Sequence, residues 1–245
     1  MIKSALTLLG LVCGLTLAAQ PAPGPAAPRT FRFIGLDGDF SNLELATGRT
    51  DSVKLTIPAK SLSNAYPCPG SDEIVLFRWI SDTDEHGQPK KTKKRMAGIP
   101  VPPGAEPFLV LLKEARQPDS PYPLQGLPID DSVKAYPAQT IRIINLTRQR
   151  LAVKVEDKAA QISINGVEAF PFPASFRMCS LQIAYDKAGA WELAYDSSQG
   201  IKRKQRAIAL VCDNPNPPNE MIGPLLVNIL KDRVPDAGNG ATALR

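Results

Sequence analysis

The only histidine limits the chemistry open to this chain of 245 residues. His86 lies in the polar segment SDTDEHG and not in an apolar run. A Ser–His–Asp or Cys–His hydrolase would have to use it, but a histidine among charged loop residues is more often solvated. A blue-copper centre needs two histidines and a cysteine, and a three-histidine zinc centre needs three. Both of these centres are therefore excluded.

The cysteines offer a second kind of chemistry. Cys179 and Cys212 lie in apolar, strand-like runs and are the predicted disulfide pair, because an exported protein meets an oxidising compartment. The alternative is that they and Cys68 are reduced thiols packed as small apolar residues. A zinc site of these three cysteines and His86 lacks the paired ligand spacing of known zinc sites. No metal ion and no other cofactor is predicted.

Carboxylates are concentrated in predicted turns, where they usually accept hydrogen bonds from the backbone or contact water. They are Asp37, Asp39, Asp82, Asp84, Glu85, Asp130 and Asp131. The segment from Asp82 begins like a calcium-binding loop, but His86 replaces an oxygen ligand and Lys93 replaces the closing glutamate. A pair of glycosidase carboxylates has no sequence signature. Hydrolysis by unidentified carboxylates is therefore kept as the alternative function.

Two basic runs are the candidate binding residues for an anionic surface. The first is Lys90, Lys91, Lys93, Lys94 and Arg95, and the second is Lys202, Arg203 and Lys204. Lysine and arginine in such runs bind phosphate or carboxylate groups; the alternative is two solvated loops. No aromatic residue lies within either run, so the pattern does not favour a platform for single-stranded nucleic acid.

The N-terminus predicts the compartment. Residues 1–19 have a short basic start, an apolar stretch and small residues at a cleavage point, which is the pattern of a secretory signal peptide. Cleavage removes Lys3 and lowers the formal charge from +5 to +4. No later stretch is apolar and long enough to span a membrane. We expect an exported protein, in the periplasm or outside the cell.

The elements that position these residues are predicted to be strands. Residues 140–155, TIRIINLTRQRLAVKV, alternate in polarity about a polar centre and predict a β-hairpin with Arg142 and Lys154 on its outer face. Residues 81–95 predict a long hairpin loop with an acidic first part and a basic second part. The chain has 24 prolines and lacks a long amphipathic helical pattern. This composition favours an all-β, immunoglobulin-like β-sandwich.

Two small sandwiches in tandem are predicted, over residues 30–118 and 119–233. A Pro/Ala linker (20–29) precedes them and a flexible tail (234–245) follows. Residues 30–36, TFRFIGL, resemble residues 140–146, TIRIINL, which favours duplication. Other echoes occur at different offsets, whereas a tandem repeat keeps one period. The alternative is one larger sandwich to which both halves contribute strands.

The stretch DDSVKAYPAQTIRIINLT…LAVKV resembles uncharacterised exported bacterial all-β proteins. The resemblance implies a bacterial envelope or periplasmic setting and assigns no residue a role. We therefore expect a non-enzymatic binding or structural module of the cell envelope. Its partner is expected to be an envelope polymer or another envelope protein, and not nucleic acid.

Overall fold

The computed structural model describes residues 29–104, 107–115, 117, 119–173, 178–216 and 223–234. The predicted signal peptide, all of the linker except Arg29 and all of the tail except Val234 lie outside the described residues. The described residues form sixteen β-strands and no helix, which confirms the predicted all-β sandwich class. Among them there is accordingly no helix long and apolar enough to cross a membrane.

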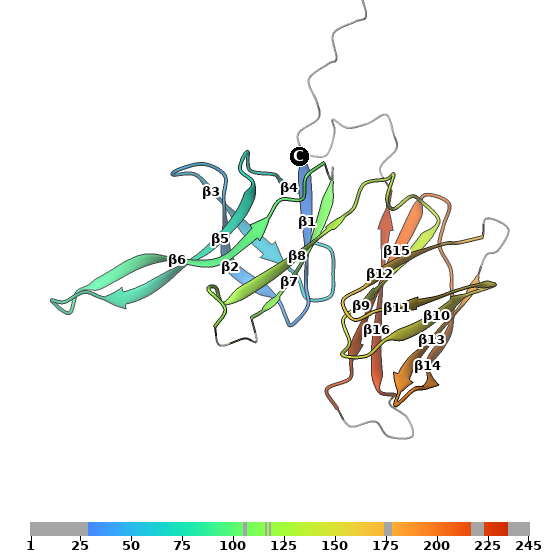
Figure 1. Ribbon diagram of the computed structural model, residues 1–245. Coiled ribbons are helices and arrows are strands. Elements are labelled where there is room, and N and C mark those ends of the chain that lie inside the picture. Colours follow the sequence, from blue (N-terminus) through green and yellow to red (C-terminus); the bar gives the residue numbers. More distant parts are fainter. Residues whose placement is uncertain are drawn as a thin grey trace, which may run out of the picture.

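Eight strands form the first half of the protein (Figure 1). They are β1 (Thr30–Gly35), β2 (Phe40–Ala46), β3 (Ser52–Ile57), β4 (Tyr66–Pro67), β5 (Glu73–Thr83), β6 (Pro89–Pro100), β7 (Phe108–Glu114) and β8 (Leu124–Asp130). They make two sheets, with the orders β4-β1-β7-β8 and β3-β2-β5-β6. The aromatic rings of Phe31, Phe33 and Phe108 pack in the core between the sheets. Strand β8 lies beyond residue 118, where the first sandwich was predicted to end, and pairs with β7.

The second half also has eight strands. They are β9 (Thr140–Asn145), β10 (Leu151–Val155), β11 (Lys158–Ile162), β12 (Val167–Pro171), β13 (Cys179–Lys187), β14 (Ala190–Gln199), β15 (Gln205–Asp213) and β16 (Leu225–Arg233). Their sheets have the orders β12-β9-β15-β16 and β11-β10-β13-β14. A second apolar core lies between these two sheets.

The hairpin predicted over residues 140–155 is wrong, because β9 and β10 belong to different sheets. The connection between them is a corner that crosses from one sheet to the other. The Asn145 side-chain amide donates to the backbone oxygens of Gln149, Ile162 and Ser163, at 2.8, 3.2 and 3.0 Å. Its carbonyl oxygen accepts from the Thr147 backbone and hydroxyl. These bonds satisfy backbone groups that a sheet ladder would otherwise pair.

The two halves have the same strand order. Strands β1 to β8 correspond one by one to β9 to β16, and in each half the first strand pairs in parallel with the seventh. Arg32 lies opposite Leu109 in one half, and Arg142 lies opposite Ile208 in the other. The similar segments TFRFIG and TIRIIN therefore occupy equivalent strands. The connections between the strands differ in length in the two halves, which explains why other similar short segments occur at different offsets.

The halves meet through equivalent faces. A third apolar cluster joins the outer face of β4-β1-β7-β8 to that of β12-β9-β15-β16. Its buried members include the equivalent pairs Ile34 and Ile144, Leu109 and Ile208, and Leu111 and Leu210. We call this interface the seam. It explains why β7, β9 and β15 are buried on both faces, and why β7 and β15 are apolar at most positions.

Candidate functional site

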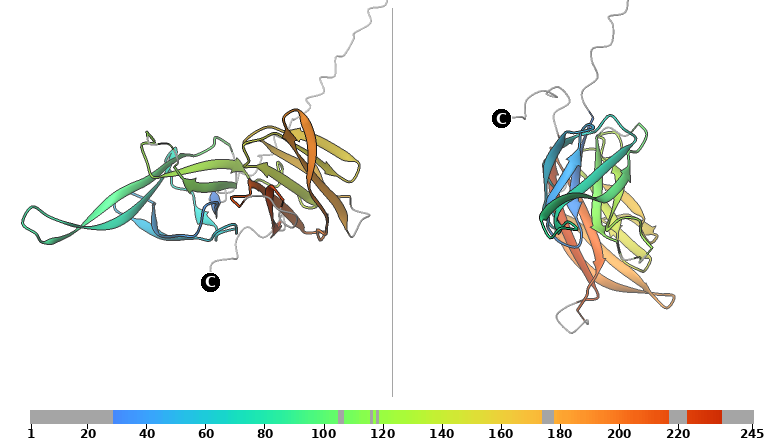
Figure 2. Two further views of the ribbon diagram at one scale, coloured as in Figure 1. Left: turned by 90° about the horizontal axis from the view of Figure 1, so that it is seen from below. Right: turned by 90° about the vertical axis from the view of Figure 1, so that its left-hand side faces the viewer.

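The hairpin of β5 and β6 extends beyond the body of the first half, away from the second half (Figures 1 and 2). Strand β2 pairs with β5 only through Leu76 and Phe77. Beyond Phe77, β5 and β6 continue as a two-stranded ribbon that runs to the pair Thr83 and Pro89. We call residues 78–94 the arm. The sequence predicts a polar loop over much of this region, but most of it is regular strand.

Cation–π contacts hold the base of the arm to the body. The Lys93 ammonium lies 3.4 Å from the centre of the Phe77 ring and 5.8 Å from that of Trp79. The Arg95 guanidinium lies 4.5 Å from the centre of the Tyr122 ring and forms an ion pair with Glu73. A lone two-stranded ribbon is marginally stable in water. These contacts therefore help to fix the direction in which the arm leaves the sandwich.

Three lysines of the arm remain available to a partner. Lys90, Lys91 and Lys94 are exposed and have no hydrogen bond or ion pair to another described residue. Side chains alternate along a strand, so Lys91 shares a face with Trp79, and Lys90 and Lys94 lie on the opposite face. Trp79 is 50% exposed. Both faces of the arm thus present positive charge, and one adds an aromatic ring.

The tip of the arm is acidic and forms a turn. The Asp84 carboxylate accepts hydrogen bonds from the backbone amides of His86 and Gln88, at 2.9 and 2.8 Å. This is the role in a turn that its residue type predicts. The His86 side chain is 79% exposed, and its charged neighbour within reach is Glu85. These surroundings give His86 no nucleophile to activate.

The second basic run is on the other half. Lys202, Arg203 and Lys204 lie in the turn that precedes β15. The Gln205 amide donates to the Lys202 carbonyl at 2.8 Å, and the Val234 amide donates to the Lys204 carbonyl at 2.9 Å. The structure does not bring this turn together with the arm. The two runs therefore do not form one basic surface.

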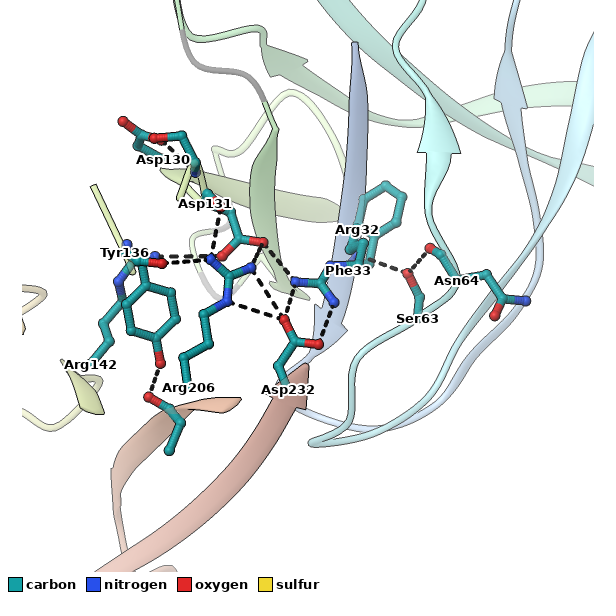
Figure 3. Close-up of polar contacts among 12 residues, drawn as sticks. Arg32, Phe33, Ser63, Asn64, Asp130, Asp131, Tyr136, Arg142, Arg206 and Asp232 are labelled. Atoms are coloured by element: carbon teal, nitrogen blue, oxygen red, sulfur yellow. Dashed lines mark hydrogen bonds and ion pairs between the residues drawn. The ribbon is translucent and has the colours of Figure 1, made fainter. Parts of the chain in front are cut away.

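A buried charge network crosses the seam (Figure 3). The Arg32 guanidinium contacts the carboxylates of Asp131 and Asp232, both at 2.7 Å. Arg206 contacts the same two carboxylates at 2.9 and 3.2 Å. Arg206 also donates to the backbone oxygens of Asp131 and Tyr136, at 3.0 and 2.9 Å. Because Arg32 belongs to β1 and Asp232 to β16, these bonds fix one half against the other.

Arg142 completes the network from β9. Its guanidinium lies 4.0 Å from the centre of the Tyr136 ring and 3.9 Å from an Asp131 oxygen. Burial lowers the pKa of Arg142, and the charge of Asp131 only partly opposes this. Burial also raises the pKa of Tyr136, whose hydroxyl donates to the backbone oxygen of Ala207. The sequence predicts an outer-face position for Arg142, but its side chain is only 4% exposed, because Tyr136 and Asp131 from the connection between β8 and β9 lie against it.

The network does not provide a glycosidase pair, although two carboxylates meet in it. A catalytic acid of that kind needs a raised pKa. Burial alone would raise the pKa of Asp232, but the hydrogen bonds and charges of Arg32 and Arg206 lower it overall. The carboxylate of Asp131 forms ion pairs with Arg32 and Arg206. Arginine side chains occupy the positions from which a substrate would have to be protonated.

The three cysteines that the structure describes, Cys68, Cys179 and Cys212, are free thiols, so the predicted disulfide between Cys179 and Cys212 is absent. Cys179 begins β13 and packs in the core of the second half. In β15 it is Val211 that packs in that core, so alternation directs the next residue, Cys212, to the other face of its sheet. There it lines a cavity of about 530 Å³ at the seam, together with Leu36 and Lys60. Among the described residues, no three His, Cys, Asp or Glu side chains gather as metal ligands.

Comparison with known proteins adds no assignment. No family model matches the chain, and no curated protein is significantly similar to it. The function must therefore be argued from the geometry of the arm, the seam and the surfaces around them.

Proposed function

We propose that this protein is a non-enzymatic binding module of the bacterial cell envelope, and that its arm binds an anionic envelope polymer. The observation that carries the proposal is the arm itself, a ribbon of exposed cations that leaves the sandwich at Phe77. Isolated surface lysines need no explanation. The arm does need an explanation, because it projects from the sandwich and adds little to the stability of the core. It buries little apolar surface and carries lysine on both faces.

The spacing of the cations fits an extended ligand. Lys91 and Lys93 are two residues apart and point to one face, which separates them by roughly 7 Å along the strand. Lys90 and Lys94 are four residues apart on the other face, which separates them by roughly 13 Å. A chain with carboxylate or phosphate groups at regular intervals could contact several of these lysines at once. Trp79 lies on the same face as Lys91 and Lys93, and its exposed ring offers a stacking surface to a sugar ring of such a polymer.

The remainder of the protein serves as a rigid mount for the arm. Two sandwich cores and the seam bury the large apolar residues, and the arginine–aspartate network fixes the two halves. A rigid mount reduces the entropy lost when a ligand is bound. Export is supported by the signal-peptide pattern of residues 1–19. N-terminal sequencing of the protein from the envelope fraction tests this part, and we expect a mature chain that starts at Gln20.

Titration of the mature chain with polygalacturonate and polyphosphate tests the binding proposal. We compare the native protein with a variant in which Lys90, Lys91 and Lys94 are changed to Gln. The matched control changes Lys202, Arg203 and Lys204 to Gln, which removes the same formal charge from the other basic run. We expect one or both polymers to bind at low salt, to dissociate at high salt and to lose affinity in the arm variant only. The proposal would be contradicted if both variants lost affinity equally, or if the native chain bound neither polymer.

A further inference from the structure

The arm has two free backbone edges. Strand β6 is the last strand of the sheet β3-β2-β5-β6, so its outer edge is unpaired along the arm in the described residues. Strand β5 also has a free edge beyond Phe77, where its pairing with β2 ends. Unpaired strand edges are templates for another strand, and proteins usually protect them. The two edges of this arm differ in how they are protected.

The β6 edge repels a second copy of itself. Its residues 90–94 are KKTKK, which is symmetric about Thr92. Antiparallel pairing of two such strands about Thr92 would place Lys91 opposite Lys93, and Lys90 opposite Lys94. Like charges directly opposite each other destabilise a strand pair, and lysine on an edge is a common protection against sheet extension. This edge is therefore suited to an anionic ligand and unsuited to self-association.

The β5 edge, in contrast, is suited to pairing with a second copy of itself. Its sequence from Arg78 is RWISD, and antiparallel pairing about Ile80 would place Arg78 of one copy opposite Asp82 of the other, twice. The same register places the two Ile80 side chains together and Trp79 beside Ser81. Trp79 is 50% exposed and Ile80 is 37% exposed, so this contact would cover apolar surface.

Arg78 also lacks a charge partner within its own arm. Its cross-strand neighbour on β6 is Lys94, which has the same charge. Its Nε atom is buried and has no hydrogen-bond partner. A second copy would bring Asp82 next to this guanidinium and so supply the missing negative charge.

We propose that two copies of the protein associate through the β5 edges of their arms, in antiparallel register about Ile80. The result is a four-stranded sheet with the order β6-β5-β5-β6, in which the two lysine-bearing β6 edges remain outermost. The two-fold symmetry closes the assembly at a dimer. The proposal does not depend on the proposed function, but it would give a polyanion two basic edges in one particle.

Sedimentation equilibrium of the mature chain over a range of concentrations tests this contact. We expect a monomer–dimer equilibrium. The variants Arg78→Asp and Asp82→Arg each put like charges at both ends of the contact, and we expect each to weaken the dimer by roughly tenfold or more. The double variant restores opposite charges in exchanged positions, and we expect its dimer to recover. The variant Lys91→Asp, which changes the charge as much as Arg78→Asp does, is the control that should still dimerise.

These outcomes separate self-association from ligand binding, because no polymer is present. All four variants change residues of the arm, outside the apolar cores, and an unchanged melting temperature would show that the cores are intact. A native chain that stays monomeric would overturn the proposal. A dimer that persists in both single variants, or that the folded double variant does not restore, would also overturn it.

Discussion

Replacing Asp131 by asparagine removes one negative charge from the centre of the seam. The Asp131 side chain is 1% exposed and contacts Arg32 at 2.7 Å and Arg206 at 2.9 Å. After the change, Asp232 is the carboxylate of the network that still contacts Arg32 and Arg206, and Arg142 loses the charge of the Asp131 oxygen 3.9 Å away. Removing one partner of a buried ion pair costs about 3–5 kcal/mol. The backbone oxygen of Asp131 still accepts from Arg206, so we expect the lower end, about 3 kcal/mol.

Thermal and urea unfolding measure this cost. For a chain of this size, about 3 kcal/mol corresponds to a fall in melting temperature of roughly 6–12 °C. Asp130→Asn is the matched control, because Asp130 is the exposed neighbour and the charge change is the same. We expect the control to change stability by less than about 0.5 kcal/mol. If Asp131→Asn costs no more than the control, the network does not stabilise the seam and the reasoning is refuted.

Three further predictions concern the cores and the titrating groups. The lowered pKa of Asp232 gives stability that is present above the ordinary pKa of aspartate, about 3.9, and is lost as the pH falls through the lower folded value. Asp232→Asn should therefore lower the stability of the protein at neutral pH, whereas in strong acid the variant and the native protein should be similarly stable. A difference between their unfolding free energies that does not change with pH would contradict this. Burial, followed by the hydrogen bond and charge of Glu156, raises the pKa of Cys179 to about 12. A thiol reagent at pH 8 should therefore leave Cys179 unmodified while the protein is folded. Detection by mass spectrometry of a disulfide-linked peptide that contains Cys179 and Cys212 would disprove the free-thiol assignment. Leu109→Ala and Ile208→Ala should each lower the free energy of unfolding by about 2–5 kcal/mol, because both side chains are buried in the seam. Trp79→Ala on the arm should lower it by less than about 1 kcal/mol. Equal losses for all three variants in urea unfolding would contradict the role of the seam.

The sequence predicts the fold class because its local signals agree. Short apolar runs separated by proline, glycine and asparagine favour strands, and the hairpins of β5 with β6 and of β13 with β14 form where turn residues predict them. The hairpin prediction for residues 140–155 fails for a physical reason. Alternating polarity shows that two segments are strands, but not whether they pair with each other or lie in facing sheets of a sandwich. The bonds of Asn145 in the corner join it to Ile162 and Ser163, 17 and 18 residues further along the chain, so the local pattern does not reveal them.

The seam was missed, although a signal for it is present. The segments FLVLLK and RAIALVC are apolar at nearly every position, which indicates burial on both faces and not on one. Arg32 and Arg142 stand at the same place in two similar segments, and this also indicates a shared environment. The carboxylate partners could not be assigned, because Arg32 and Asp232 are 200 residues apart and meet only through the docking of two sheets. The basic run of the arm could be found from composition, whereas the ribbon that carries it and its free β5 edge required the strand pairing.

The fluorescence of Trp79 tests the central claim, that the arm is the binding element, most directly. The chain has two tryptophans, so the variant Trp191→Phe leaves Trp79 on the arm as the only one. We titrate this variant with the anionic polymer that the native chain binds. We expect the Trp79 emission to change in proportion to bound polymer and to return to its starting value in high salt. Binding that leaves Trp79 unchanged, while the reciprocal variant Trp79→Phe shows a response from Trp191, would place the contact on the second half and contradict the account.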